Sequence, residues 1–384
     1  MIHTAPFIDA SPLRLALFSD TYSPQVNGVA RTLEKLVAAV EERGGVVRVY
    51  AVDEDAAECS DQVRRFAGRP FWGYRELKVA WPSFASVLRD VRSFAPTLVH
   101  AATEFGIGLA GRRAARALRA PFVTSYHTNF ATYATHYHLG LLQYPGWSYL
   151  RWFHSAAQRT YCPTHAIESD VQGRGFSNTA VWSRGVDTQQ FAPRFRSLTI
   201  REQLDANDDT VVVAYVGRLA AEKGLDVGVE AMRRVHAARP GRVKFMAVGD
   251  GPLAPYLAQH APPGSWLPGT LGGEALSRAY ASADVFLFPS VTDTFGNVML
   301  EAMASGLPVI GANVGPTREQ LLPDRGWVMT SQDPQRYADA LIALVDDRGA
   351  LLTRRAAALA FAASKTWGAV WDLLIRDYLL LHRA

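Results

Sequence analysis

The sequence predicts an α/β protein made of two successive halves, each a doubly wound parallel sheet. Short apolar runs alternate with amphipathic helical segments along most of the chain, which is typical of β-α-β units. The alternation breaks around residues 191–204 and then starts again. The chain has 384 residues, of which 48% are hydrophobic, so each half is large enough to bury its own core.

The first half opens with a buried strand over residues 13–18 and a polar loop. Apolar residues then recur at helical spacing from about residue 29, which predicts a helix. The next strand is expected over residues 46–52. The remaining elements expected in this half are strands over 97–101, 121–125 and 179–182 and a helix over 108–118.

The second half starts with a strand over residues 210–216 and a helix over 224–238. Further strands are expected over 243–248, 284–289 and 308–312, and an amphipathic helix over 366–382 closes the chain. We therefore expect domains over 1–190 and 191–365 and a helical segment over 366–384. Ligands of such sheets bind at the carboxyl ends of the strands, and a cleft between two halves is the natural reaction site.

Composition excludes several classes of protein. The net charge of +4 does not require nucleic acid as a partner, although it suits contact with an anionic surface. Two cysteines, Cys59 and Cys162, cannot form a disulfide framework or a structural zinc site, and a reducing cytosol is expected. The N-terminus lacks the features of a signal peptide, and no window reaches the ~20 apolar residues of a membrane-spanning helix.

Residues 290–319 are the most informative segment. Asp293 opens a loop that carries Phe295, Gly296 and Asn297 and runs into a helical segment with Glu301 in its first turns. The N-terminus of a helix offers unpaired N–H groups and a partial positive charge, which suit a phosphate. Carboxylates on both sides can bind hydroxyl groups. The segment therefore favours a nucleotide-sugar over free phosphate, metal or nucleic acid.

This block resembles the signature of the retaining glycosyltransferases of family 4, an acidic residue and a glutamate eight positions apart with Phe-Gly between them. The resemblance covers nearly the whole chain and implies the GT-B fold, with two Rossmann-like domains facing a cleft and a C-terminal helix that crosses back. Residues 1–190 would bind the acceptor and residues 191–365 the nucleotide-sugar. It also implies that Glu301 binds the ribose and Asp293 the sugar hydroxyls, while backbone N–H groups of Phe295, Gly296, Asn297 and Val298 contact sugar and phosphate.

Arg218 and Lys223 form the next candidate pair. They lie between a strand and a helix in the segment YVGRLAAEKG. Two fixed cations can stabilise the charge that develops on a departing diphosphate and can replace a divalent metal. A solvated loop with two surface cations is the alternative. The segment resembles the diphosphate clamp of the family, which predicts catalysis without a metal ion.

Gly28 and His127 follow strands of the first half. Gly28 follows Asn27 and opens a helix, so the backbone there could approach a phosphate closely. The alternative is a simple turn in which Asn27 is the N-cap of the helix. The family has a glycine-rich loop here, often with two adjacent glycines. The resemblance places His127 beside the donor sugar. We expect the acceptor to contact Asn129, Tyr133 and Tyr137, whereas His136 and His138 are expected on the surface or in packing.

Other segments give weaker evidence about which residues contact the nucleobase and which branch of the family the chain resembles. Leu271 would lie at the edge of the base, or its segment is only a strand-to-helix turn. Asp250, between glycines, is expected in a structural turn. The run from Arg184 to Asp187 resembles a branch of GDP-mannose-dependent α-mannosyltransferases that act on lipids and of sulfoquinovosyl lipid synthases. A glycosidase with two catalytic carboxylates is a rival that nothing else supports.

A basic run on one predicted helix face points to an anionic membrane, with a solvated helix face as the alternative. The run contains Arg112, Arg113, Arg116 and Arg119, with Arg64, Arg65 and Arg69 nearby in sequence.

We expect a cytoplasmic enzyme, peripheral on the inner face of the membrane, that transfers mannose from GDP-mannose to a lipid without a cofactor. The alternatives are a UDP-sugar donor, a polysaccharide-repeat acceptor, or a non-catalytic nucleotide-sugar-binding subunit.

Overall fold

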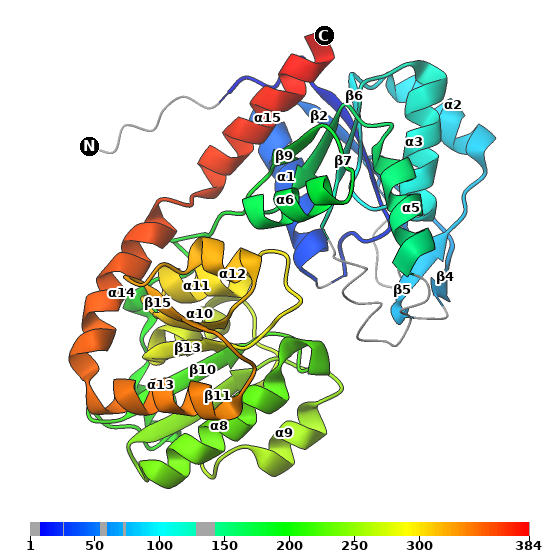
Figure 1. Ribbon diagram of the computed structural model, residues 1–384. Coiled ribbons are helices and arrows are strands. Elements are labelled where there is room, and N and C mark those ends of the chain that lie inside the picture. Colours follow the sequence, from blue (N-terminus) through cyan, green and yellow to red (C-terminus); the bar gives the residue numbers. More distant parts are fainter. Residues whose placement is uncertain (1–7, 26, 54–59, 72–73, 128–142, 384) are drawn as a thin grey trace. The chain divides into compact units, whose positions relative to one another are not determined.

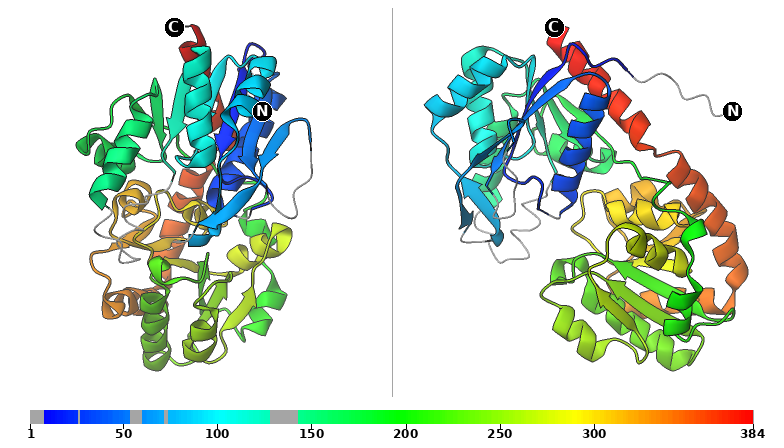
Figure 2. Two further views of the ribbon diagram at one scale, coloured as in Figure 1. Left: turned by 90° about the vertical axis from the view of Figure 1, so that its right-hand side faces the viewer. Right: turned by 180° about the vertical axis from the view of Figure 1, so that it is seen from behind.

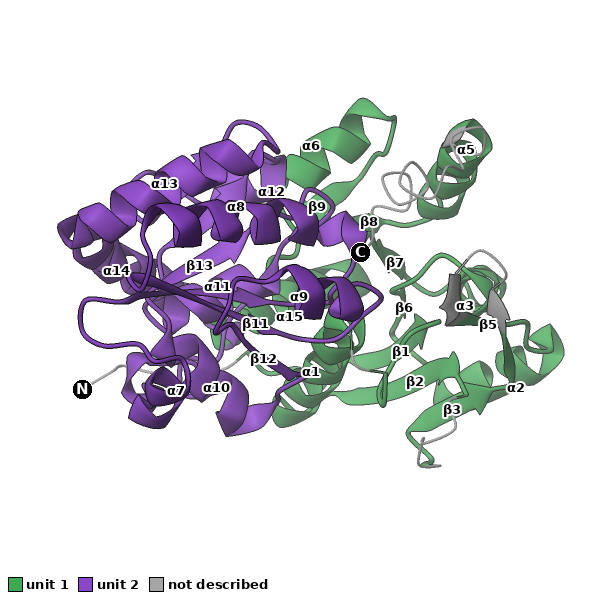
Figure 3. Ribbon diagram, turned by 90° about the horizontal axis from the view of Figure 1, so that it is seen from below, with its two compact units in different colours: residues 1–183, 368–384 green, residues 184–367 purple. Residues whose placement is uncertain are grey.

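The computed structural model describes residues 8–25, 27–53, 60–71, 74–127 and 143–383. Contacts within the chain divide it into two compact units (Figures 1 and 3). Unit 1 comprises Met1–Ser183 and Gly368–Ala384, and unit 2 comprises Arg184–Trp367. Each unit contains one main parallel sheet, which confirms the predicted fold class.

The sheet of unit 1 has seven strands in the order β3-β2-β1-β6-β7-β8-β9, and all its pairings are parallel. The strand order reverses between β1 and β6, which makes this the switch point where ligands of doubly wound sheets bind. The strands are β1 (Arg14–Ser19), β2 (Val46–Val52), β3 (Val63–Phe66), β6 (Leu98–Ala101), β7 (Phe122–Ser125), β8 (Arg159–Cys162) and β9 (Thr179–Val181).

Helices cover both faces of this sheet. Figure 1 shows α2 and α3 on one side, where Phe18 and Tyr50 of the strands pack against Val91 and Ala114 of the helices. A hairpin of β4 (Gly68–Phe71) and β5 (Tyr74–Ala80) stands apart from the main sheet. The helices are α1 (Gly28–Glu42), α2 (Phe84–Phe94), α3 (Gly106–Leu118), α5 (Gln143–His154), α6 (His165–Gly173) and α15 (Trp367–Arg383).

The C-terminal helix α15 is held on unit 1 by buried polar contacts. Arg43, at the end of α1, pairs with Asp372 at 2.9 Å, and α1 and α15 lie side by side in the right-hand view of Figure 2. The hydroxyl of Tyr378 lies 2.8 Å from Nδ1 of His100, whose Nε2 lies 2.6 Å from Oγ of Ser125. Complete burial lowers the pKa of His100 to about 3, so this ring is neutral at ordinary pH.

The sheet of unit 2 has six parallel strands in the order β12-β11-β10-β13-β14-β15, with its switch point between β10 and β13. Its central strand is buried on both faces. Val212 and Ala214 pack in one core and Val211 and Val213 in the other. The strands are β10 (Val211–Val216), β11 (Val243–Val248), β12 (Trp266–Gly269), β13 (Val285–Phe288), β14 (Val309–Ala312) and β15 (Gly326–Met329).

Helices on both faces complete these two cores. One core contains residues of α10, α11 and α14, and the other contains residues of α8, α9 and α13. The helices are α7 (Leu198–Gln203), α8 (Leu225–Ala238), α9 (Ala254–His260), α10 (Gly273–Ser282), α11 (Asn297–Ala304), α12 (Gly315–Gln320), α13 (Pro334–Asp346) and α14 (Arg348–Ala363), with single 3₁₀ turns at Pro193–Phe195 and Ala221–Lys223.

The two ends of unit 2 lie next to each other. Val186 and Thr366 form a parallel bridge, and the N–H of Val186 donates to the carbonyl of Lys365 at 2.9 Å. A Cβ on Gly185 would lie 2.7 Å from the nitrogen of Trp367, so only glycine allows this close approach.

Candidate active site

The carboxyl ends of β10 and β13 bring together the residues expected to bind a diphosphate. The loop after β10 carries Arg218 and Lys223, and the loop after β13 carries Asp293. These strands flank the switch point of unit 2, so their loops leave the same edge of the sheet. The sequence placed these residues in segments 70 positions apart, and the fold makes them neighbours.

A glycine joins the two loops. Gly224 has a positive φ of +64°, and a Cβ there would lie 2.6 Å from the carbonyl oxygen of Pro289. A side chain at position 224 would therefore push the loops apart. The hydroxyl of Thr292 also donates to the carbonyl of Glu222 at 3.1 Å. These contacts hold Lys223 against the loop of Asp293.

Lys223 and Asp293 form an ion pair in which the ammonium group contacts both carboxylate oxygens. Nζ of Lys223 lies 2.8 and 2.9 Å from the two carboxylate oxygens of Asp293. Nη1 of Arg218 lies 3.8 Å from Oε1 of Glu222, which is buried. The nearby phenol of Tyr215 has a pKa raised above its usual value by burial and by the charges of Asp293 and Glu222.

The N-terminus of α11 lies at the same edge of the sheet and has no side-chain cap. Its N-cap is Gly296, with φ of +79°, where a Cβ would lie 2.8 Å from Cε of Met299. The side chain of Gln320 donates to the carbonyl of Phe295 and so holds the turn. Among the described residues, Oδ1 of Asn297 is buried without a hydrogen-bond partner. Such a helix end suits an anionic group with hydroxyls beside it.

The predicted carboxylate Glu301 lies on α11, as the sequence indicated. Its side chain is half-buried, and its Oε2 accepts a hydrogen bond of 2.9 Å from the hydroxyl of Tyr280 on α10. Val298 is partly buried against the core, and Phe295 is buried in it. The side chain of Phe295 is therefore not available to a ligand, although its backbone is.

Leu271 lies on the same edge of the sheet. It follows β12 and is partly buried against the core. The loops after β10 and β11 touch, because a Cβ on Gly249 would lie 1.9 Å from the carbonyl oxygen of Gly217. The N–H of Gly249 also donates to the carbonyl of Gly269, at the end of β12, at 2.8 Å. Asp250 lies between two glycines just before the turn at residues 252–253, and its side chain accepts from the N–H of Gly251 at 2.7 Å.

In unit 1 the structure describes two of the predicted residues. His127 follows β7, is buried, and packs edge-on against Trp182 with 5.3 Å between ring centroids. Gly28 is exposed at the start of α1, and Asn27 is the N-cap, accepting from the N–H of Ala30 at 2.9 Å. The Asn N-cap that the sequence suggested is therefore present. The residues Asn129, Tyr133, Tyr137, His136 and His138 lie outside the described part of the chain.

The structure also shows a buried acidic residue at the switch point of unit 1 that the sequence did not point to. Asp20, directly after β1, accepts hydrogen bonds from the N–H of Ile107 at 3.0 Å and from the hydroxyl of Thr103 at 2.7 Å. Burial, with a smaller contribution from the charge of Glu104, raises the pKa of Asp20 to about 6. Asp20 thereby caps the N-terminus of α3. A carboxylate directly after a buried strand was the available signal.

The basic run divides into two groups. Arg113 and Arg116 of α3 are exposed, as is Arg119 directly after the helix, and the guanidinium of Arg112 stacks on the half-exposed ring of Trp152 in α5 at 3.9 Å. Arg64 instead pairs with Asp61 and Asp90, and Arg65 donates to the backbone carbonyls of Ser23 and Val52. Only the residues of α3 therefore form the basic helix face that the spacing predicted.

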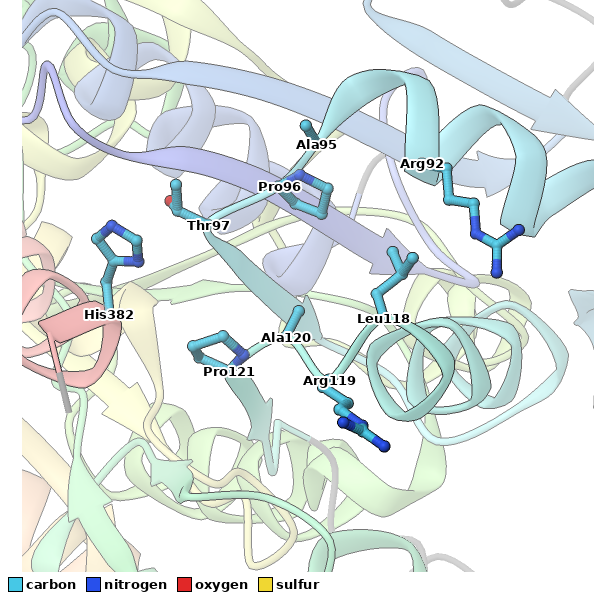
Figure 4. Close-up of a pocket in the computed structure, with 9 residues that line it drawn as sticks. All are labelled: Arg92, Ala95, Pro96, Thr97, Leu118, Arg119, Ala120, Pro121 and His382. Atoms are coloured by element: carbon cyan, nitrogen blue, oxygen red, sulfur yellow. The ribbon is translucent and has the colours of Figure 1, made fainter.

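A shallow pocket of about 410 Å³ lies elsewhere in unit 1, at the amino ends of β6 and β7. The side chains of Arg92, Arg119 and His382 on its lining do not converge on one point (Figure 4). It lies at the edge of the sheet opposite the carboxyl ends of the strands, so it is not the predicted site. Within the described ranges, no cluster of metal-ligating side chains occurs, and no helix has the length and apolarity needed to cross a bilayer.

Comparison with known proteins follows the same division of the chain. Residues 26–190 match the family model Glycosyltransferase Family 4, and residues 210–347 match the model Glycosyl transferases group 1. The chain is 34% identical to the GDP-mannose-dependent alpha-mannosyltransferase of Mycobacterium tuberculosis, over 95% of this chain and 96% of that protein. It is 32% identical to sulfoquinovosyl transferase SQD2 of Arabidopsis thaliana, over 90% of this chain and 70% of that protein.

Solved structures share the fold. The crystal structure of Anabaena HepE in complex with UDP and glucose matches 95% of this chain and 98% of its own, with a TM-score of 0.72 and 20% identity. A likeness at this identity establishes the architecture, which is the GT-B fold that the resemblance predicted, and says nothing by itself about substrates.

Proposed function

The chain belongs to glycosyltransferase family 4 and is a retaining hexosyltransferase, and on this premise we propose that it transfers mannose from GDP-mannose to a hydroxyl of a membrane glycolipid. The curated relatives support this donor, because several of them are described as GDP-mannose-dependent mannosyltransferases. Relatives described as alpha-monoglucosyldiacylglycerol synthases support a lipid acceptor.

One observation carries the proposal in the structure: the ion pair of Lys223 and Asp293 beside the uncapped N-terminus of α11. Without ligand, the cation and the carboxylate satisfy each other. A nucleotide-sugar offers a better partner to each, because its diphosphate can bind Lys223 and its sugar hydroxyls can bind Asp293. The site is therefore preorganised for a ligand that carries phosphate and hydroxyl groups side by side.

The proposed reaction breaks the bond between C1 of the sugar and the oxygen of the β-phosphate. The electron pair of that bond stays on the phosphate oxygen, and the diphosphate gains negative charge. Arg218, Lys223 and the N–H groups of the first turn of α11 stabilise this charge. The acceptor hydroxyl forms its bond to C1 on the same face, and its proton passes to the departing phosphate oxygen. The products are GDP and an α-linked mannoside.

The other residues have proposed binding roles. Glu301 binds the ribose hydroxyls, Leu271 contacts the base, and Gly28 lets backbone approach the phosphates. We place His127 beside the sugar, which is consistent with its position after β7. We also keep Asn129, Tyr133 and Tyr137 as proposed acceptor contacts.

We further propose that unit 1 docks on an anionic membrane through α3 and α5. Arg113 and Arg116 are exposed on α3, and Trp152 and Tyr144 of α5 are 50% and 87% exposed. Aromatic rings with a polar edge favour the headgroup region of a bilayer, and nearby cations add attraction to anionic lipids. Arg112, stacked on Trp152, connects the two groups.

A donor panel tests the proposal. The purified protein is incubated with GDP-mannose, UDP-glucose and UDP-sulfoquinovose in the presence of a lipid extract, and products are identified by mass spectrometry. We expect a hexose-extended lipid and GDP from GDP-mannose. Turnover with only a UDP-sugar would overturn the proposed donor and leave the transferase assignment intact. Binding of a nucleotide-sugar without any release of nucleotide would contradict the proposed turnover.

A further inference from the structure

The hydrogen bond between Tyr280 and Glu301 connects a buried residue of α10 to the carboxylate proposed to bind ribose. The phenol oxygen of Tyr280 lies 2.9 Å from Oε2 of Glu301. Tyr280 itself is fully buried, so it does not reach solvent or a ligand. Its only route to function is therefore through the residues that it contacts.

The ring of Tyr280 has little freedom to move. Phe191 packs edge-on against it, with 5.6 Å between ring centroids and 89° between planes, and Phe286 packs at 5.8 Å. All three rings belong to the same core, which also contains the buried face of α11. Because the ring is closely packed, its hydroxyl is held in one position relative to the core.

A glutamate side chain has more torsional freedom than a packed tyrosine ring. A glutamate has three side-chain torsions and loses rotamer freedom when it is held in one geometry. A phenol O–H that donates to one carboxylate oxygen is a charge-assisted hydrogen bond, which is stronger than a neutral one. The bond from Tyr280 therefore restricts the carboxylate before any ligand arrives.

We propose that Tyr280 is a positioning residue that holds Glu301 in the orientation that receives the ribose hydroxyls of the donor. This inference rests on the proposed function, in which Glu301 binds ribose. Without the hydroxyl, Glu301 samples other rotamers and must be ordered when the donor binds. Ordering one such side chain on binding weakens affinity by up to roughly tenfold.

The variant Tyr280→Phe removes one oxygen atom and keeps the ring in the core. We expect the KM for GDP-mannose to rise roughly tenfold while kcat changes less than threefold, because the diphosphate clamp is untouched. The matched control is Tyr337→Phe. Tyr337 is also fully buried in unit 2, but it belongs to the other core, on α13. It should leave both constants unchanged.

A donor analogue without the two ribose hydroxyls distinguishes positioning from a general structural effect. Wild-type enzyme should lose at least tenfold in kcat/KM on this analogue, whereas Tyr280→Phe should lose less than threefold. An equal loss in both proteins would overturn the role of Tyr280 and leave the ribose contact of Glu301 standing. If wild-type enzyme does not distinguish the analogue from GDP-mannose, both the ribose contact and the inference fail.

A double-variant cycle gives a second measurement. Tyr280→Phe should have almost no effect on the dissociation constant of GDP, measured by calorimetry, in a Glu301→Ala background, because the residue on which it acts is gone. A tenfold effect that persists in that background would show that Tyr280 acts on the fold and not through Glu301. The thermal midpoints of the folded variants are compared with that of Glu301→Ala, which leaves α10 unchanged. If Tyr280→Phe does not fold, Glu301→Ala still tests the ribose contact alone.

Discussion

The substitution Lys223→Ala is the strongest test of the candidate site, because Lys223 is one half of its central ion pair. Nζ of Lys223 lies 2.8 Å from Asp293, and both side chains are mostly buried, with 17% and 24% of their surface exposed. Removing a preorganised group that stabilises transition-state charge typically costs about 10²–10³ in kcat. We therefore expect kcat to fall by at least a hundredfold.

A second effect should appear in donor binding. Without Lys223, the carboxylate of Asp293 faces the diphosphate with no cation beside it. Two like charges about 5 Å apart repel by about 3 kcal/mol at an effective dielectric constant of ~20, before screening by water at this partly exposed site. We therefore expect the KM for the donor to rise as well. Adding Asp293→Asn to Lys223→Ala should partly restore binding, although Asp293→Asn alone should weaken it.

The assay is a steady-state measurement of released GDP, with circular dichroism and thermal midpoints as checks of folding. Lys244→Ala is the matched control, because Lys244 is another largely buried lysine of unit 2 in an ion pair, with Asp205 at 3.5 Å, away from the carboxyl edge of the sheet. It should keep activity within twofold. Folded Lys223→Ala with a kcat within threefold of the wild-type value would refute the proposed clamp.

The remaining predictions concern ribose binding, metal, membrane and pH. Glu301→Ala should abolish transfer without unfolding the protein, and folded enzyme of wild-type rate would contradict its role. Transfer should persist in excess EDTA, since two cations stabilise the diphosphate, and strict dependence on a divalent ion would rule out the clamp mechanism. Sedimentation with liposomes should require anionic lipid, and a double charge reversal at Arg113 and Arg116 should reduce it more than tenfold at ~1 kcal/mol per charge; equal binding to neutral vesicles would disprove docking. The pKa of His100 is about 3 in the fold, whereas that of an exposed histidine is about 6.5, so neutral His100 stabilises the protein above pH 6.5 and this stability is lost as pH falls toward 3. Between pH 7.5 and 4.5 the loss is roughly 3 kcal/mol, and urea unfolding of His100→Gln should lack this slope.

The sequence predicted nine strands of the two main sheets and missed the short strands β3, β8, β12 and β15. The strand over residues 46–52 is confirmed with the same bounds, and β10 begins one residue after its predicted start. Continuous apolar runs of this kind indicate parallel strands. In contrast, β8 carries Arg159 and Thr160, and β3 carries two arginines, so neither has an apolar run. The helix α7 lies inside the segment that the pattern suggested was only a break.

The sequence could predict the separate motifs of the candidate site, but not the contacts between them. The sequence identified Asp293, Glu301 and Lys223 from their chemistry and their likeness to a family signature. It did not indicate that Lys223 contacts Asp293, because this depends on the close approach of Gly224 to the loop after β13. The sequence also contained no indication of a role for Tyr280, because a tyrosine on the apolar face of a helix is typical of a core residue. Residue roles and the domain boundaries at 190 and 365 stay predictions.

The bridge between Val186 and Thr366 has a consequence for how such enzymes diversify. Unit 2 enters and leaves the polypeptide at a single junction, so topologically it is a cassette inserted near the end of unit 1. A foreign cassette with the same paired ends needs only this junction to match. Exchange of one sugar donor for another could therefore proceed by grafting the whole cassette, while the first strands and the terminal helix continue to form one body around their own sheet.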